Sequence, residues 1–359
     1  MNRPVKSLEF RSDTFTLPMP AMRKAMADAE VGDDQYGEDP TVNRLEERAA
    51  EIVGKEAALY VASGMLGNLC GVLSQAQRGD EVILGDLAHI YQNEMGAFTV
   101  LGGLHGRVVP NGDGMPSLDD IEAAIRPAVG AFPRSALLCL ENSHNNCGGS
   151  VITGAQTRAA AAFAHERGLK VHLDGARIFN AAAALGVDVR ELTDPVDTVQ
   201  FCFSKGLSAP VGSILCGPRD TVARARKIRK LLGGAMRQAG VIAAAALVGL
   251  ETMRERLVED HVNARALADG LAAIHGIKID AGKVVTNIVS FEVERSAMDA
   301  GDFQKACAER GLRISRYLGN SPRLRMVTHA NVSRADVDAA LTIMSGVLSQ
   351  MPQPVTAAD

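Results

Sequence analysis

Short apolar runs closed by turn residues recur through the first two thirds of the chain. They lie at residues 57–62, 81–84, 136–140, 169–173, 198–203 and 211–216. Between several of them lie alanine-rich stretches with helical periodicity, such as residues 118–125 and 157–165. Because strands that alternate with helices are typical of βαβ units, this pattern predicts an α/β domain with a mainly parallel sheet.

The pattern changes after about residue 250. Residues 221–250 predict a helix that is interrupted at Gly233–Gly234. The rest of the chain predicts a long amphipathic helix, a strand near 284–291, a helix at 302–309, a strand near 323–328 and a final helix after Ser333. We therefore expect a large domain over residues 1–250, which includes the N-terminal segment 1–20, and a smaller α+β domain over residues 251–359.

Composition and charge narrow the class of protein. The net charge is -4 with both signs interspersed, which gives no reason to expect a nucleic-acid partner. Residues 1–10 lack the apolar core of a signal peptide. The apolar run 239–250 predicts a buried helix, since spanning a bilayer takes roughly 20 residues. The cysteines are widely spaced in apolar runs, which favours buried free thiols. We expect a cytoplasmic protein with no membrane partner.

Charged residues follow two of the expected strands. Asp174 comes directly after the run 169–173, and Ser204–Lys205 come directly after the run 198–203. Ligands on open α/β sheets gather at the carboxyl ends of strands. Pyridoxal phosphate (PLP) needs a lysine that forms an imine and an acid beside its pyridine nitrogen. Partial desolvation of Lys205 would favour the uncharged amine that such an imine requires.

A candidate phosphate site lies after the run 57–62. Ser63–Gly64, followed by Asn68, opens a stretch with helical periodicity. Backbone N–H groups at the start of a helix can hold a phosphate. Strand–glycine–helix junctions are common, so this signal predicts little by itself.

An ordered set of motifs along nearly the whole chain resembles the L-threonine aldolase (low-specificity) family of fold-type I PLP enzymes, which is grouped with the β-eliminating lyases. The motifs are RSDT (11–14), GDDQYGEDPTVNRLEE (32–47), KEAALYVASG (55–64), AHIYQNEMG (88–96), ENSHN (141–145), HLDGARIFNA (172–181), CFSKGLSAPVGS (202–213), GGAMRQAG (233–240) and RMVTH (325–329). The resemblance implies an aspartate aminotransferase-like large domain with a mainly parallel seven-stranded sheet and a small α+β domain. It also implies PLP as the cofactor and a homotetramer or homodimer with active sites shared between subunits.

The resemblance further implies a role for each matching residue. Lys205 would hold PLP as a Schiff base, Asp174 would pair with the pyridine nitrogen, and His89 would stack on the ring. The residues implied to contact the cofactor elsewhere, chiefly at its phosphate, are Gly64, Met65, Ser204, Arg177 and Arg237, and the last comes from the neighbouring subunit. The residues implied to bind substrate are Ser12, Arg177, Arg325, His144 and Tyr36, of which His144 approaches the β-hydroxyl. No metal is expected.

These roles imply retro-aldol cleavage of a β-hydroxy-α-amino acid, such as threonine or allo-threonine, into glycine and an aldehyde. The base that removes the β-hydroxyl proton is His89, His144 or a water that they orient. A β-eliminating lyase, a decarboxylase or a racemase on the same fold stays an alternative, as does a non-catalytic α/β binding protein or a cofactor-free structural subunit. Retention of both histidines favours cleavage, because elimination needs no β-alkoxide.

Three residues depart from the family pattern. Met65 stands where threonine is usual, which removes a hydroxyl contact to the phosphate and predicts weaker PLP binding. Ala235 replaces a glycine without much expected effect. Asn93 stands where an aromatic residue is usual near the β-substituent, so it either points elsewhere or makes that pocket more polar. Glu94 stays without a role.

Overall fold

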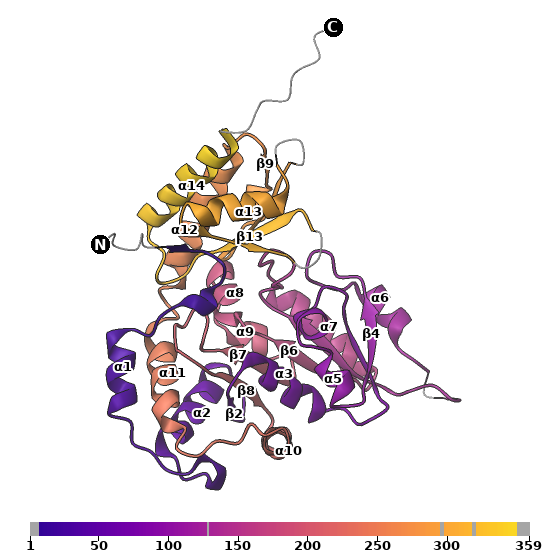
Figure 1. Ribbon diagram of the computed structural model, residues 1–359. Helices are drawn as coiled ribbons and strands as arrows, with labels where there is room; N and C mark the ends of the chain where they lie inside the picture. The colour runs from indigo at the N-terminus through magenta and orange to yellow at the C-terminus, as the bar shows by residue number, and fades with distance from the viewer. Residues whose placement is uncertain (1–6, 128, 295–297, 318–320, 350–359) are drawn as a thin grey trace.

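The larger part of the molecule is built on a seven-stranded sheet. The computed structural model, which describes residues 7–127, 129–294, 298–317 and 321–349, has the strand order β2-β8-β7-β6-β5-β3-β4 (Figure 1). The strands are β2 (Ala57–Val61), β3 (Glu81–Gly85), β4 (His105–Val109), β5 (Ser135–Glu141), β6 (Lys170–Asp174), β7 (Thr198–Cys202) and β8 (Ser213–Gly217). Neighbours from β4 to β7 pair in parallel, whereas β8 is antiparallel to both β7 and β2. The predicted mainly parallel seven-stranded sheet is confirmed.

The apolar runs predicted every strand of this sheet except β4. The sequence of β4, HGRVV, is mostly exposed, and only Val109 is buried. The strand lies at the edge of the sheet and pairs with β3 alone. Most side chains of β4 are uncovered, so it does not need a continuous apolar run. The other edge strand, β2, is buried on both faces and keeps such a run.

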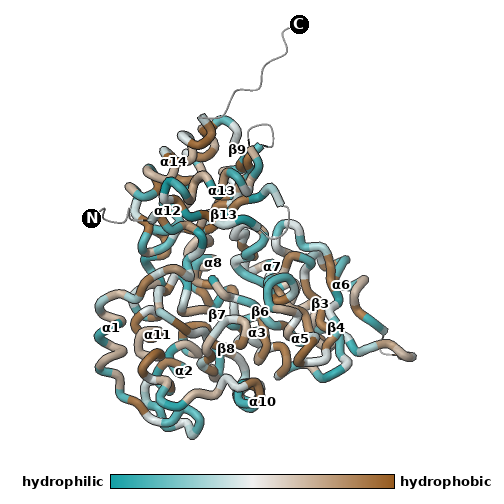
Figure 2. Tube along the Cα trace, in the orientation of Figure 1, coloured by the Kyte–Doolittle hydropathy of each residue, from teal (hydrophilic) through white to brown (hydrophobic). Residues whose placement is uncertain are grey.

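Helices cover both faces of the sheet. One face is covered by α2 (Pro40–Ile52), α7 (Gly154–Glu166), α8 (Ile178–Leu185) and α11 (Gly240–Thr252), and the other by α3 (Gly64–Leu73), α5 (Ala97–Val100) and α10 (Arg219–Leu231). Alternate residues of β2 serve the two faces: Tyr60 packs in the first core and Leu59 in the second. Figure 2 shows hydrophobic segments along the central strands and hydrophilic residues in many outer turns.

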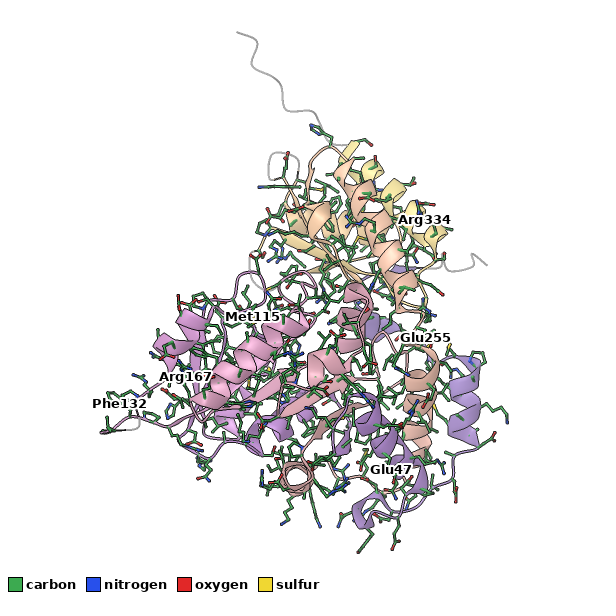
Figure 3. The ribbon with its side chains drawn as sticks, turned by 180° about the vertical axis from the view of Figure 1, so that it is seen from behind. Glu47, Met115, Phe132, Arg167, Glu255 and Arg334 are labelled. Atoms are coloured by element: carbon green, nitrogen blue, oxygen red, sulfur yellow. The ribbon has the colours of Figure 1, made fainter. Side chains whose placement is uncertain are left out.

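Short helices complete the larger part. They are α1 (Pro20–Ala27), α4 (His89–Gln92), α6 (Leu118–Ala124) and α9 (Arg190–Thr193). Seen from behind, α7 lies along the outside of the sheet, and Arg167 at its end forms an ion pair with Glu122 of α6 (Figure 3). The predicted interruption at Gly233 is confirmed, because α10 ends at Leu231 and α11 begins at Gly240. Gly233 has a φ of 77°, which favours glycine.

The C-terminal part has a second sheet with the order β12-β13-β10-β9. Its elements are α12 (Leu257–Ala272), β9 (Ile277–Lys278), β10 (Ile288–Val293), α13 (Ala300–Glu309), β11 (Leu312–Arg313), β12 (Ser315–Arg316), β13 (Arg323–Val327) and α14 (Arg334–Ser349). From the N-terminal segment, β1 (Leu8–Glu9) pairs with β11, and Phe10 is buried in this core. Residues 8–10 therefore pack with the C-terminal elements, and the domain division at residue 250 stays a prediction.

Two predictions from composition concern the cysteines and the run 239–250. All six cysteines are free; Cys147 is half-buried and the others are buried, as predicted. The run 239–250 forms most of α11, whose alanines pack in the main core. Across the described ranges, no helix is both long and apolar enough to cross a bilayer.

Candidate active site

A cleft of about 300 Å³ opens beside the carboxyl ends of the central parallel strands. Its lining residues are Ser12, Thr14, His89, Asn93, Asn145, Asn146, Arg177, Lys205, Ser315, Arg316, Tyr317 and Arg325. Segments that follow β3, β5, β6 and β7 meet here because parallel strands end at the same edge of the sheet. Its described lining contains three arginines and one lysine and no acidic residue. The cleft is therefore suited to an anionic ligand.

Asp174, the last residue of β6, is buried near this cleft. Its Oδ2 accepts a hydrogen bond from Asn68 Nδ2 (2.9 Å), and its Oδ1 accepts one from the backbone N–H of Ala176 (3.1 Å). Among the described residues, no arginine or lysine forms an ion pair with it. Since a buried carboxylate without a cation is costly, Asp174 is suited to a cationic group on a ligand.

His89, the first residue of α4, lines the cleft, and its ring contacts Glu94, which lies outside the lining. Its Nδ1 lies 2.9 Å from Oε1 of the buried Glu94, and its backbone N–H donates to Glu141 Oε2 (2.7 Å). Burial opposes protonation of His89, but the hydrogen bond to Glu94 and the charges of Asp174 and Glu141 outweigh it and raise its pKa. His89 therefore gains basicity from residues that lie outside the cleft.

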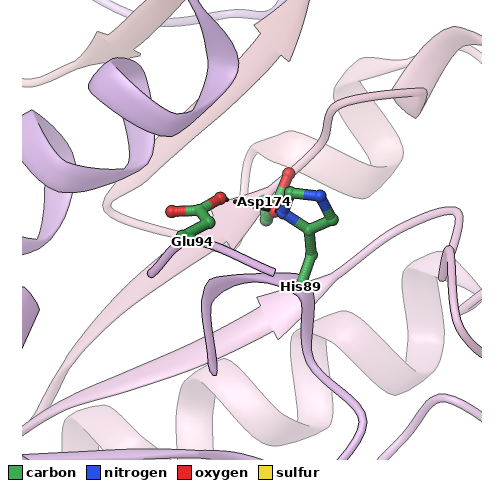
Figure 4. Close-up of side chains that lie close together, drawn as sticks. All are labelled: His89, Glu94 and Asp174. Carbon is green, nitrogen blue, oxygen red and sulfur yellow. Dashed lines mark hydrogen bonds and ion pairs between the residues drawn. The ribbon is translucent and has the colours of Figure 1, made fainter. Parts of the chain in front are cut away.

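The side chains of His89, Glu94 and Asp174 lie close together (Figure 4). Their ligand atoms all lie within 4.8 Å of one another, a spacing that a metal ion could also use. Asn68 already bridges the two carboxylates, because its Nδ2 donates to both Glu94 (2.8 Å) and Asp174 (2.9 Å). The absence of a metal stays a prediction.

Arg177 lines the cleft, and two of its three guanidinium nitrogens donate hydrogen bonds to Asp13. Its Nε and Nη2 each donate to one carboxylate oxygen of Asp13 at 2.7 Å. Burial opposes ionisation of Asp13, but Arg177 and the nearby charge of Lys205 hold its pKa well below the usual range. Only Nη1 of Arg177 faces elsewhere, towards Asn145 Oδ1 at 3.3 Å. The expected carboxylate-binding arginine is thus bound to a carboxylate of the protein itself.

Arg325, in β13, has no such partner. Its Nη1 donates to Asn145 Oδ1 (2.7 Å) and its Nη2 to the carbonyl of Arg11 (3.3 Å), and no ion pair of Arg325 occurs within the described ranges. Burial and the charge of Arg177 lower its pKa. A half-buried guanidinium without a counter-charge is suited to bind a carboxylate. Ser12, which caps the first turn after residue 12, lies in the same lining.

His144 lies outside the lining. Its ring is fully buried, and Nε2 lies 2.9 Å from Asn111 Nδ2 and 3.4 Å from Glu141 Oε2, the oxygen that also binds the backbone of His89. Its Nδ1 has no hydrogen-bond partner among the described residues. In this arrangement the ring of His144 contacts Glu141 and does not reach the cleft lining. The expected approach of His144 to the substrate hydroxyl therefore stays a prediction.

The expected phosphate site lies where α3 meets the end of β7. Ser63 caps α3 by accepting from the backbone N–H of Leu66 (3.3 Å). A Cβ on Gly64 would lie 2.9 Å from Cys202 Sγ, so only glycine permits this close approach. Met65 is the second residue of the helix, and Ser204 is half-buried immediately before Lys205. The two segments that were expected to hold the phosphate are thus neighbours.

Two predicted site residues lie away from the cleft of the single chain. Tyr36 is 73% exposed, and the side chain of Arg237 is 59% exposed and pairs with Asp33 at 3.2 Å. Neither lines the cleft. Both were expected to act at a site shared between subunits, so their roles stay predictions.

Several residues of the site had no role in the sequence interpretation. Asp13, Glu94, Glu141 and Asn145 lie inside the motifs that carried the family resemblance. Asn146, which follows the last residue of ENSHN, was not considered. The signal that could identify them is their type and place, because polar residues inside the same motifs often serve as hydrogen-bond partners of the site residues.

Comparisons with known proteins agree along nearly the whole chain. The model of the family described as "Beta-eliminating lyase" matches residues 9–294. The low-specificity L-threonine aldolase 1 of Arabidopsis thaliana is 44% identical, over 98% of this chain and 99% of its own. The low specificity L-threonine aldolase of Escherichia coli (strain K12) is 43% identical, over 91% of this chain and 95% of its own. The solved structure of the Leishmania major threonine aldolase shares the fold, with a TM-score of 0.79, 19% identity, and coverage of 94% and 99%.

Proposed function

The chain belongs to the β-eliminating lyase family and, within it, to the low-specificity L-threonine aldolases, and on this basis we propose that it cleaves β-hydroxy-α-amino acids into glycine and an aldehyde. The cofactor is pyridoxal phosphate. The observation that carries the proposal is a cleft that joins Lys205, His89 and Arg325, next to a buried Asp174 that forms no ion pair with any described residue.

The residues of the chain fit this cofactor. Asp174 offers a buried carboxylate to the protonated pyridine nitrogen, and the start of α3 at Gly64 offers backbone N–H groups to the phosphate beside Ser204. Lys205 offers the amine that holds the aldehyde carbon. When bound, PLP supplies an electron sink for the charge left at Cα as the Cα–Cβ bond breaks.

Arg325 is the residue that we assign to the substrate carboxylate. It can form a bidentate pair, since no acid of the described chain competes for it. Arg177 supports it by holding Asn145 from the other side, and it is itself fixed by Asp13. With the carboxylate held there and the amine near Lys205, the substrate has a fixed orientation in the cleft.

His89 is the residue that we assign as the base for the β-hydroxyl proton. Its Nδ1 is bound to Glu94, so Nε2 is the ring nitrogen left for the substrate. The raised pKa improves its strength as a proton acceptor, and Glu94 stabilises the charge that it acquires. His144 would act through Glu141, which binds both the ring of His144 and the backbone of His89.

We further propose a homotetramer or homodimer with shared sites. The exposure of Tyr36 and Arg237, outside the cleft of their own chain, supports a role in the site of a neighbouring subunit. The free cysteines support a reducing, cytoplasmic location. The expected small-molecule partner is the amino-acid substrate.

The proposal is tested by supplying threonine and allo-threonine to the PLP-loaded protein and measuring glycine and acetaldehyde. We expect both products, and we expect Lys205→Ala to abolish them while Lys227→Ala, an exposed lysine on α10, leaves the rate unchanged. Formation of 2-oxobutyrate and ammonia in place of glycine would identify a β-eliminating lyase and defeat the aldolase assignment.

A further inference from the structure

Three asparagine side chains form a hydrogen-bonded row along one wall of the cleft. Asn145 Nδ2 donates to Asn146 Oδ1 (3.1 Å), and Asn146 Nδ2 donates to Asn93 Oδ1 (3.0 Å). All three residues line the cleft. Because each carboxamide has one donor end and one acceptor end, the row has a direction, and its chemistry at the far end depends on that direction.

The first end of the row is fixed by two arginines. Arg325 Nη1 and Arg177 Nη1 both point at the same atom of Asn145, at 2.7 and 3.3 Å. A guanidinium can only donate, so this atom is the carboxamide oxygen. The amino group of Asn145 must then face Asn146, which presents its oxygen in return.

The middle of the row is fixed independently by the backbone. Asn146 Nδ2 also donates to the carbonyl of Leu87 (2.8 Å), and a carbonyl can only accept. The same nitrogen therefore serves Asn93, whose oxygen is the atom that accepts. This leaves the amino group of Asn93 as a donor that has no hydrogen-bond partner among the described residues.

Asn93 lines the cleft at the end of the short helix that begins with His89, the proposed base for the β-hydroxyl. It is the C-cap of α4, and its backbone N–H donates to the carbonyl of His89 (2.8 Å). A substrate held by its carboxylate at Arg325 and by its amine near Lys205 directs its third substituent along the remaining wall. Among the described residues, no acidic side chain lines the cleft, so a negatively charged substituent meets no like charge from them.

We propose that the Asn93 amino group selects substrates whose β-substituent carries an oxygen acceptor, either a hydroxyl or a carboxylate. This inference rests on the aldolase function proposed above and names the substrate class of the same site. Asn93 is exposed, so water can serve its amino group until a substrate binds. An oxygen acceptor on the substituent replaces that water, whereas an alkyl substituent such as that of threonine displaces it without a new hydrogen bond and is the poorer fit. The row of asparagines links this choice to the arginines at the carboxylate end.

The first test compares threonine, 4-hydroxythreonine and 3-hydroxyaspartate by kcat/KM for glycine release. We expect the wild-type protein to prefer the two oxygen-bearing substrates. Asn93→Leu should lower the ratio of kcat/KM to that of threonine by about two- to tenfold for 4-hydroxythreonine and by about ten- to a hundredfold for 3-hydroxyaspartate, the ranges for one lost hydrogen bond to a neutral and to a charged acceptor. Gln92→Leu removes the neighbouring carboxamide, which does not line the cleft, and should leave the ratio unchanged. An unchanged ratio in Asn93→Leu overturns the inference.

The second test reverses the row while Asn93 stays in place. In Asn146→Asp, residue 146 can only accept, so the amino group of Asn93 turns towards it and the oxygen of Asn93 faces the cleft. We expect the preference for 4-hydroxythreonine over threonine to be lost, as in Asn93→Leu; this neutral pair is compared because the added carboxylate disfavours 3-hydroxyaspartate by itself. The variant also loses the hydrogen bond to the Leu87 carbonyl, so we expect a lower melting temperature and check its folding by circular dichroism. A folded Asn146→Asp protein that keeps the full preference would overturn the directional role of the row.

A binding measurement separates this inference from the proposed function. L-homoserine and L-2-aminobutyrate differ by one hydroxyl, and calorimetry of the PLP-loaded protein gives their dissociation constants without any cleavage. We expect tighter binding of homoserine in the wild type and equal binding in Asn93→Leu. Equal binding in the wild type overturns the inference even if threonine is cleaved, whereas absent glycine release defeats only the aldolase assignment.

Discussion

Asn68 organises the buried acids beside the cleft. Its Nδ2 donates to both Glu94 and Asp174, and its Oδ1 faces His172 Nε2 at 3.1 Å. Burial lowers the pKa of His172 to about 4, so the ring is neutral and can donate from Nε2 while Nδ1 accepts from Thr198. Burial raises the pKa of Glu94, and the charge of Asp174 adds to this effect while the hydrogen bond to His89 opposes it. One amide thus holds two carboxylates that would otherwise repel each other.

At this scale we predict a shifted pH profile for Glu94→Gln. The base His89 must be unprotonated, so kcat/KM falls as the pH drops through the pKa of His89. Glu94 raises that pKa, and its removal should therefore move the acidic limb of the profile to lower pH. We expect the plateau to fall by less than the roughly 10²- to 10⁴-fold that loss of a general base costs.

The profile is measured from pH 5 to 9, with Glu166→Gln on the exposed end of α7 as the control. His89→Asn should remove the limb altogether. An acidic limb that stays at the same pH in Glu94→Gln would show that another group is the base.

The starts of two helices, α4 and α3, position the proposed base and the expected phosphate site. α4 is a single turn that begins with His89 and ends at its cap, Asn93, so one short element supplies both the proposed base and the proposed specificity residue. α3 begins at Gly64 against the end of β7, where Cys202 and Gln200 leave no room for a Cβ. The position of this helix start therefore depends on the absence of a side chain.

At the scale of the element we predict that Gly64→Ala weakens PLP binding. The added Cβ would lie 2.9 Å from Cys202 Sγ and 3.3 Å from Gln200 Nε2, so the start of α3 must shift away from the phosphate site. We expect about a tenfold rise in the PLP dissociation constant, equivalent to about 1.4 kcal/mol. Titration of the protein with PLP, followed by absorbance, measures it.

Gly346→Ala in α14 is the matched control. A Cβ there meets nothing within 4 Å, and alanine is favoured over glycine inside a helix by about 0.5–1 kcal/mol. This variant should be more stable to urea and bind PLP normally. Normal PLP binding by Gly64→Ala would contradict the close-approach argument.

The whole molecule brings distant parts of the chain to one cleft. Ser12, Asn145, Lys205 and Arg325 come from the N-terminal segment, the large sheet and the C-terminal sheet. Large apolar side chains stay exposed in the single chain, among them Met95 at 88% and Leu231 at 85%.

At this scale we predict complementation between inactive subunits. If Arg237 serves the site of a neighbouring subunit, Arg237→Ala and Lys205→Ala damage different sites of a mixed oligomer. Unfolding and refolding the two variants together should then restore sites that contain both residues, up to about a quarter of wild-type activity for random mixed dimers. Activity no higher than that of the separate variants would place Arg237 within its own chain's site or outside any site.

The sequence by itself determined most of the architecture. Strands that are covered on both faces are short apolar runs, and these runs located every strand of the large sheet except the mostly exposed β4. Residues directly after such runs lie at the carboxyl edge of the sheet, which is how Asp174 and Lys205 were found. The ordered motifs added His89, Arg177 and Arg325, which the structure brings to the same cleft.

Only the tertiary structure decided how these residues are paired. Arg177 is bound by Asp13, 164 residues away in the chain, and Arg325 forms no ion pair within the part of the chain that the structure describes. The direction of the row from Asn145 to Asn93 depends on which atoms the two arginines and the Leu87 carbonyl face. Hydrogen-bond partners follow from the orientation of side chains in space, and no periodicity along the chain encodes that orientation.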